Sequence, residues 1–373
     1  MRLVRFIRRV VLATAMVVLT GLLLTTLPVW LLVAAILSPL VEGRLRPLRL
    51  LWVLVLQMVL ESAVLVTLLL LWVASGFGLF IHRPFFERLH YLVAKAYLGV
   101  LFSEAGRVLN LEIATEGPSP DAHPGEPLLV CSRHAGPGDS FTLMYALMHW
   151  YDREPRVVLK NTMAWDPMVD VLLNRVPSRF ISTSPRRSDD IEKRIADLAT
   201  GLDANDAFVI FPEGGNFTRD RRQRAIDKLN SLGLHRMARR AERMQHVLAP
   251  RPGGLLAALE AAPDADVVLV AHTGLEHLVT VADVWRELPM DKRLLMRWWR
   301  VPREDIPEGK EARIDWLFTW WEEIDRWVDA HSPVDLLWRH ALCDVAWSAA
   351  RRTAGRTARL GSATRARSDG LTD

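Results

Sequence analysis

The fold is decided by residues 128–140, which read LLVCSRHAGPGDS. The first five residues are apolar or small and predict a buried strand, Leu128–Ser132. The glycines and proline that follow are typical of a tight turn, and Ser140–Trp150 has the spacing of an amphipathic helix. A turn between such a strand and helix lies at the carboxyl edge of an α/β sheet, where these folds bind ligands.

The same alternation continues along the chain on both sides of this stretch. Short β-rich apolar runs alternate with longer amphipathic ones, which predicts strands alternating with helices. The fold class that follows is α/β, with a mixed, mostly parallel sheet flanked by helices. The further predicted strands are Arg156–Lys160, Ala207–Phe211 and Asp266–Ala271, and the further helices are Asp189–Leu202 and Asp220–Gln245.

Two long apolar runs precede this globular pattern. Residues 10–37 contain no charged side chain, and residues 50–81 contain only Glu61. Each run exceeds the roughly 20 residues that a helix needs to cross a bilayer. We therefore expect an N-terminal two-helix membrane anchor, with Pro28 favouring a tilt or kink. Two crossings and a hairpin that enters one leaflet both fit, whereas no small-residue cleavage site supports a secretory signal.

Basic residues flank the predicted anchor. Four arginines lie in residues 1–9, and Arg83, Arg88 and Lys95 follow the second run. Because positive charge favours the cytoplasmic side, both ends of the anchor are expected there, in the inner or plasma membrane. The arginines between residues 44 and 49 weaken a simple two-span topology and suit a hairpin.

Composition limits the remaining possibilities. The chain has 373 residues, 47 Lys+Arg against 43 Asp+Glu, and 50% hydrophobic residues. These values exclude a disordered chain and a highly charged nucleic-acid-binding arm. Two cysteines make no disulfide framework, and no Cys/His cluster indicates a metal site. The predicted organisation is an anchor (1–81), a globular domain (82–350) and a basic, disordered tail (351–373).

Tryptophans are concentrated near the end of the globular domain. Trp298, Trp299, Trp316, Trp321 and Trp327 lie within 30 residues of one another. Tryptophan suits a membrane interface, because its ring is apolar and its N–H group remains hydrated. Packing against the α/β body is an equally good interpretation of the same residues.

His134 and Asp139 can form a general base at the first turn. The tight turn can bring the imidazole and the carboxylate into contact although they lie five residues apart. Asp139 would then fix the tautomer of His134 and stabilise its protonated form, while His134 accepts a proton near neutral pH. Asp139 or Ser140 is also a natural helix N-cap. Alone, this spacing is equally typical of a histidine near a capping aspartate.

A second strand-end motif strengthens the case. Residues 208–215 read FVIFPEGG, so Glu213 follows a buried strand in a glycine-bearing turn. Asn216, Thr218 and Arg219 come soon after, and this pattern suits anion binding by backbone N–H groups and an arginine. We expect Glu213 to orient an arginine or a hydroxyl, because a free carboxylate would repel a phosphate.

With these motifs the sequence resembles the glycerophospholipid acyltransferases, which include 1-acylglycerol-3-phosphate acyltransferase and the lysocardiolipin-type enzymes. His134 to Asp139 matches the HX4D box of that family, and Phe211 to Gly214 matches its FPEG box. Two further stretches, residues 247–254 (VLAPRPGG) and 300–307 (RVPREDIP), resemble its LxPRxxG and RxPxxxIP segments. The resemblance runs from about residue 82 to residue 331.

The resemblance implies a membrane-bound O-acyltransferase. Its expected reaction moves a fatty acyl group from acyl-CoA, or from acyl carrier protein, to a lysophospholipid hydroxyl, with 1-acyl-sn-glycerol-3-phosphate as the first acceptor. His134 would be the base and Asp139 its support, with acyl-CoA as co-substrate, membrane lipids as partners, and no cofactor, metal or nucleic acid. The expected substrate-binding residues are Glu213, Gly214, Lys160, Arg186, Arg187, Arg219 and Arg251.

Departures from the family pattern leave alternatives open. The usual EGTR is here Glu213-Gly214-Gly215-Asn216, and the Phe-Ile-x-Arg box is represented by residues 180–183 (FIST), so each lacks its arginine. Another lysophospholipid or a glycolipid acceptor is therefore a second hypothesis. Gly138-Asp139-Ser140 also opens a GDS-type serine esterase motif, although that chemistry needs a histidine to activate Ser140. A lipid-binding protein without catalytic activity is the remaining alternative.

Overall fold

The computed structural model describes residues 2–41, 45–117, 125–136, 138–181, 188–274, 276, 285 and 292–332. Residues 1–329 form one compact unit, and residues 330–373 form a second unit that is described only as far as residue 332. The predicted tail 351–373 and the predicted binding residues Arg186 and Arg187 lie outside the described part of the chain.

Seven strands of the described chain form one sheet in the order β1-β7-β6-β2-β5-β3-β4. The five strands from β6 to β4 run parallel to one another, whereas β7 is antiparallel to β6 and parallel to β1. This arrangement confirms the mixed, mostly parallel sheet. The strands are β1 (Leu111–Glu116), β2 (Leu128–Ser132), β3 (Glu154–Lys160), β4 (Ser178–Ile181), β5 (Asp206–Ile210), β6 (Asp266–Thr273) and β7 (Lys292–Val301).

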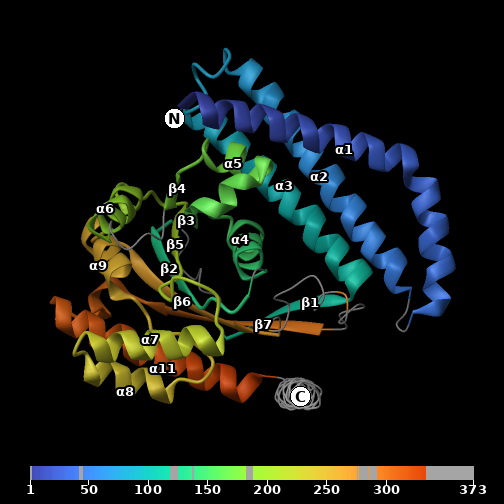
Figure 1. Ribbon diagram of the computed structural model, residues 1–373. Helices are drawn as coiled ribbons and strands as arrows, with labels where there is room; N and C mark the ends of the chain where they lie inside the picture. Colours follow the sequence, from blue (N-terminus) through green and yellow to red (C-terminus); the bar gives the residue numbers. More distant parts are fainter. Residues whose placement is uncertain are drawn as a thin grey trace, which may run out of the picture. The chain divides into compact units, whose positions relative to one another are not determined.

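Helices cover both faces of the sheet (Figure 1). In β2, Leu129 and Cys131 pack into the core on one face, and Leu128 and Val130 pack into the core on the other. Because successive side chains of a strand point to opposite faces, only a strand covered on both sides is apolar throughout. One face carries α6 (Ser188–Ala199), α7 (Arg219–Ser231), α8 (His235–Arg243), α9 (Pro252–Ala261) and α11 (Lys310–His331).

The opposite face carries α4 (Asp139–His149), and beyond it lie α3 (Pro84–Leu109) and α5 (Pro167–Leu173). A third apolar cluster joins these helices to α2 (Arg46–Ala74) through residues such as Leu68, Leu98 and Met168. Three short 3-10 helices complete the described elements: η1 (Ser38–Leu40), η2 (Asn161–Trp165) and η4 (Arg303–Asp305).

The basic stretch 220–245 forms two helices and not the one that we predicted. Helix α7 ends at Ser231 and α8 begins at His235, with Gly233 between them at φ +73°. That conformation is left-handed and suits glycine. Arg222 then joins the two helices by donating to the carbonyl oxygens of Glu242 and Met244.

The tryptophans pack against the sheet. Trp321 of α11 is fully buried, Trp298 of β7 is 2% exposed, and Trp327 is 7% exposed. Trp299 and Trp316 pack at the border of the same core region. These contacts support the packing interpretation over a membrane-interface role.

Two N-terminal helices are long and apolar enough to cross a membrane, Val4–Leu40 and Arg46–Ala74. They belong to α1 (Arg2–Leu37), continued by η1, and to α2. Only 6% and 22% of their most apolar windows are buried, so their side chains are available to lipid, which suggests membrane association. Helix α1 contains Pro28 and changes direction along its length (Figure 1), in agreement with the predicted kink.

Ion pairs attach the first turns of α1 to the globular part. Arg8 and Arg9 both bind the buried carboxylate of Asp170 in α5, at 3.0 Å and 2.9 Å. Farther along, the hydroxyl groups of Thr20 in α1 and Ser62 in α2 lie 2.8 Å apart. The apolar helices are therefore fixed both to each other and to the sheet domain.

Candidate functional site

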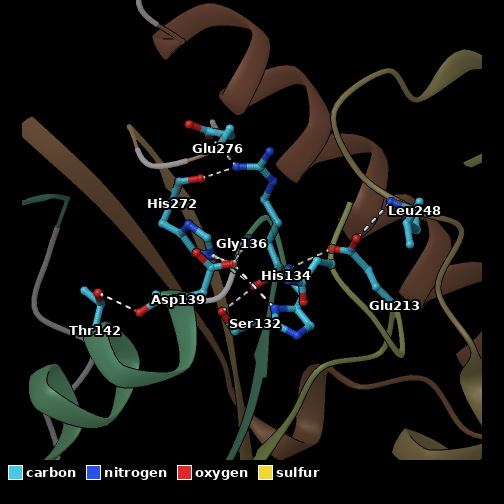
Figure 2. A network of polar contacts seen from close by, with 12 residues as sticks. Ser132, His134, Gly136, Asp139, Thr142, Glu213, Leu248, His272 and Glu276 are labelled. Carbon is cyan, nitrogen blue, oxygen red and sulfur yellow. Dashed lines mark hydrogen bonds and ion pairs between the residues drawn. The ribbon is translucent and has the colours of Figure 1, made fainter. Parts of the chain in front are cut away.

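The first strand-end loop brings His134 and Asp139 together (Figure 2). Nδ1 of His134 lies 3.5 Å from Oδ2 of Asp139, the long end of a hydrogen bond. The same carboxylate oxygen accepts the backbone N–H of Gly136 at 2.5 Å. The side chain of Asp139 is 1% exposed and that of His134 is 15% exposed, so the imidazole is the part that a substrate can reach.

Asp139 does not cap α4 in the way that we predicted. The N-cap is Gly138, with no side-chain cap hydrogen bond, and Asp139 is the first residue of the helix. Its carboxylate points back into the turn and holds Gly136 there. Capping rules would assign this acidic side chain to the helix. It instead contacts the imidazole of His134.

The surroundings of Asp139 keep its carboxyl group ionised. Burial alone would raise its pKa, but His272, His134 and the N–H of Gly136 together lower the pKa below the usual value. An ionised Asp139 favours the proton of His134 on Nδ1, which leaves Nε2 unprotonated. Nε2 can then accept a proton from a substrate, which is what a general base requires.

Glu213 follows β5 and is 1% exposed. One carboxylate oxygen accepts the backbone N–H of His134 and the other accepts that of Leu248, both at 3.0 Å. Burial raises the pKa of Glu213 to about 8, and the two N–H groups oppose that rise. We expected this carboxylate to orient an arginine or a hydroxyl; it instead holds the backbone of the loop that carries His134.

Three cationic side chains surround the turn after Glu213. A Cβ atom at Gly214, where φ is +68°, would lie 3.0 Å from Nη1 of Arg251. A Cβ atom at Gly215 would lie 3.3 Å from Nη1 of Arg221 and 3.5 Å from Nζ of Lys160. Burial and the two arginines lower the pKa of Lys160. Within the described part of the chain, no carboxylate pairs with these three cations, so the cluster suits an anion.

The structure thus assembles several predicted binding residues and leaves others apart. Lys160 ends β3, Gly214 follows β5, and Arg251 precedes α9, yet all three meet at one turn. Arg219 is exposed at the first residue of α7, and Arg221, two positions later, lies beside Gly215. Arg221 was missed because a basic helix gives no sign of which of its arginines faces the turn.

His272 is the second residue that sequence reasoning missed. Its spacing to the other histidines suggests no metal site. In the structure its Nε2 lies 3.0 Å from the carbonyl oxygen of Arg133 and 3.6 Å from Oδ2 of Asp139 (Figure 2). A signal was present, because His272 directly follows the predicted strand Asp266–Ala271 at the same sheet edge.

The serine-esterase hypothesis finds no supporting contact in the described part of the chain. A serine esterase requires a histidine at the nucleophile, but no hydrogen bond joins Ser140 to a histidine in the described ranges. No group of three His, Cys, Asp or Glu residues in those ranges is arranged to hold a metal ion.

Comparisons with known proteins match the chain to acyltransferases. Residues 108–270 match the family model described as Acyltransferase, and the match includes both strand-end motifs. An uncharacterized acyltransferase of Schizosaccharomyces pombe is 23% identical over 185 residues, which cover 46% of this chain and 50% of that protein. The chain thus aligns with about half the length of this relative.

A solved structure is similar over a larger share of the chain. The 1-acyl-sn-glycerophosphate (LPA) acyltransferase PlsC from Thermotoga maritima aligns with a TM-score of 0.40 and 15% sequence identity. The alignment covers 71% of this chain and 95% of that one.

Proposed function

We propose that the chain is an acyltransferase, as the match of residues 108–270 to that family model supports, and that it transfers a fatty acyl group from acyl-CoA to the hydroxyl of a lysophospholipid. The observation that carries this proposal is the contact between His134 and Asp139 beside the cations Lys160, Arg221 and Arg251. A base and an anion site at one sheet edge suit an acceptor that carries both a hydroxyl and a phosphate. The first acceptor we propose is 1-acyl-sn-glycerol-3-phosphate.

The proposed reaction needs no covalent enzyme intermediate. Nε2 of His134 removes the proton of the acceptor hydroxyl while the hydroxyl oxygen bonds to the thioester carbonyl carbon. The C–S bond then breaks, and the departing thiolate takes the proton from the imidazolium. Asp139 stabilises that imidazolium through Nδ1, 3.5 Å from its carboxylate. The first N–H groups of α4 would stabilise the oxyanion that forms between the two steps.

The cations would bind the phosphate of the acceptor. Lys160 offers a point charge, whereas Arg221 and Arg251 offer planar groups that can bind two oxygens at once. The family's EGTR arginine is replaced by Asn216, and Arg221 lies near enough to supply a guanidinium at this turn. Acceptors with other headgroups remain the second hypothesis, because this cluster combines residues outside the family box.

The anchor would keep the site beside its lipid substrates. Acceptor and product both partition into the bilayer, so a protein held there by α1 and α2 avoids extracting them. We further propose that the sheet domain lies on the cytoplasmic side, where acyl-CoA and acyl carrier protein are available. The basic residues at both ends of the anchor support that side.

A direct transfer assay tests the proposal. The purified full chain in detergent is given radiolabelled acyl-CoA with lysophosphatidate, lysophosphatidylethanolamine, lysophosphatidylcholine or monoacylglycerol. We expect acylation of a phosphate-bearing acceptor and none of monoacylglycerol, with acyl carrier protein as a second donor. His134→Ala should lower the rate by at least about 100-fold. An inactive wild type across the panel, or an equally active variant, would overturn the proposal.

A further inference from the structure

The end of β6 contributes a buried histidine to the site. His272 is 3% exposed and lies one residue before the carboxyl end of its strand. Strand β6 pairs with β2 in parallel, with Ser132 opposite Val270. His272 therefore emerges beside the loop that carries His134.

The contacts of His272 fix its protonation. Nε2 lies 3.0 Å from the carbonyl oxygen of Arg133, which can only accept a hydrogen bond, so Nε2 carries a proton. That N–H group also lies 3.6 Å from Oδ2 of Asp139, on which His134 and Gly136 converge as well. The interaction with His272 is the largest of those that lower the pKa of Asp139 against its burial.

The peptide bond between Arg133 and His134 is held from both sides. Its carbonyl oxygen accepts from His272, and its N–H donates to Glu213 at 3.0 Å. Because a peptide unit is planar, these two side chains set the plane from which His134 projects, together with the hydroxyl of Ser132, which donates to the same carbonyl oxygen at 3.1 Å. Neither His272 nor Glu213 needs to touch the substrate to influence the direction of the imidazole.

The side chain of Arg133 completes a reciprocal contact. It donates to the carbonyl oxygen of His272, while the ring of His272 donates to the carbonyl oxygen of Arg133. Arg133 is 1% exposed and forms an ion pair with Glu276 at 2.8 Å, and Glu276 accepts the N–H of Gly274. The ends of β2 and β6 are thus joined by side chains where the strand pairing ends.

We propose that His272 is a positioning residue of the acyl transfer site, and that its Nε2–H group aligns His134 and Asp139 through the Arg133 carbonyl and the Asp139 carboxylate. This inference rests on the proposed function. These two contacts account for a polar side chain at this position, since every other residue of β6 is also buried and most are apolar.

Two substitutions test this role. His272→Phe keeps a ring of similar shape and removes the N–H donor, whereas His272→Gln restores a donor near the position of Nε2. For the Phe variant we expect kcat to fall about 10- to 100-fold, with little change in the KM of the acceptor. The Gln variant should recover to within about five-fold of wild type.

His90 provides the matched control. It is a fully buried histidine in α3 that contacts the carbonyl oxygen of Phe86 and the side chain of Arg175, outside the site. His90→Phe should lower the thermal unfolding midpoint and leave kcat within about two-fold of wild type. If His272→Phe behaves in the same way, or if His272→Gln is as impaired as His272→Phe, the positioning role is refuted.

A measurement without turnover separates this inference from the proposed function. The ring ¹⁵N resonances of His134 are recorded in the full chain labelled at histidine and assigned with His134→Gln. We expect them to shift in His272→Phe and to return toward wild type in His272→Gln. Unchanged resonances in His272→Phe overturn the inference even if transfer is observed, and shifted resonances support it even if no tested acceptor is acylated.

Discussion

The loops that follow β2 and β5 place buried carboxylates in opposite electrostatic situations. Asp139 is 3% exposed and has a lowered pKa, because two imidazoles and one N–H group outweigh its burial. Glu213 is 1% exposed and its pKa is raised to about 8, because burial outweighs its two N–H partners. Both residues follow a buried strand of the same sheet.

The difference shows that neighbouring charges, more than burial, assign the roles. A carboxylate against an imidazole can stabilise developing positive charge during a reaction. A carboxylate that accepts only backbone N–H groups has no such partner and instead fixes the chain around it. We therefore expect substitutions at Asp139 to affect chemistry, and substitutions at Glu213 to affect geometry and stability.

Asp139→Asn should have the largest effect and would test the chemical half of this comparison. The amide cannot stabilise the imidazolium, so kcat should fall on the order of 1,000-fold in the transfer assay. Thr142→Val is a matched control on α4, since it removes a hydrogen bond to the carbonyl oxygen of Gly138 and leaves the contact between His134 and Asp139 in place. An Asn variant that retains most of its activity would contradict the assigned role of Asp139.

Glu213→Gln should have an intermediate effect. The amide group of glutamine can accept only one of the two backbone N–H groups, from His134 and Leu248, that the carboxylate accepts. We expect activity to fall about 10- to 100-fold and stability to fall by about 1–3 kcal/mol. Denaturant unfolding in detergent measures the second quantity, and an unchanged unfolding midpoint would argue against the bridging role.

The raised pKa of Glu213 gives a pH signature. The folded protein holds a proton on this group up to about pH 8, whereas the unfolded chain releases it near 4.5. Its contribution to stability is therefore complete below pH 4.5 and is lost as the pH rises through 8. Over that interval, unfolding midpoints of the wild type should decline more steeply than those of Glu213→Gln. Parallel profiles would place the titration elsewhere.

Two substitutions, Lys160→Ala and Arg251→Ala, test the cations around the turn that follows Glu213. Each should raise the KM of a phosphate-bearing acceptor about 10-fold and leave kcat nearly unchanged, because each removes one charged hydrogen bond. Lys228→Ala removes an exposed charge at the far end of α7 and serves as the control. An equal KM increase in the control would show that the effect comes from the net charge of the protein and not from a phosphate site.

Glu276→Gln should have the smallest effect on transfer at neutral pH, a loss of a few-fold. Although burial opposes it, the ion pair with Arg133 lowers the pKa of Glu276 to about 2 from its ordinary 4.5. The stability it contributes is present above pH 4.5 and is lost as the pH falls toward 2. Unfolding midpoints between pH 7 and pH 3 should therefore fall less in this variant than in the wild type.

Sequence patterns located the reactive groups better than their partners. His134, Asp139 and Glu213 were found because each lies next to a strand of unbroken apolar character. The strand that contains Trp298 and Trp299 was missed, because charged residues interrupt the apolar ones in β7 without a regular period. Strand β4 was missed because it is only four residues long. The roles of His272 and Arg133 depend on the adjacency of β2 and β6, which are more than 130 residues apart in the chain.

The two carboxyl groups illustrate the same limit. Sequence placed Glu213 in a turn at the correct sheet edge, but the N–H groups that occupy its oxygens come from residues 134 and 248. Spacing within one loop cannot reveal such partners. Likewise, the grouping of Lys160 with Arg221 and Arg251 arises only when the end of β3, the first turn of α7 and the start of α9 meet.

The strand order sets the spacing between the polar groups of the site. Four consecutive neighbours in the sheet, β6, β2, β5 and β3, end at or near a polar residue of the site. In the same order, these residues are His272, His134, Glu213 and Lys160. Adjacent strands are about 4.8 Å apart, so the strands that lead to His134 and Lys160 lie roughly 10 Å from each other. The hydrogen bonds of the sheet fix this distance between the strands. The reacting groups can come closer only through the length and direction of their side chains. The site would therefore select acceptors by the number of bonds between their anionic group and the oxygen that is acylated.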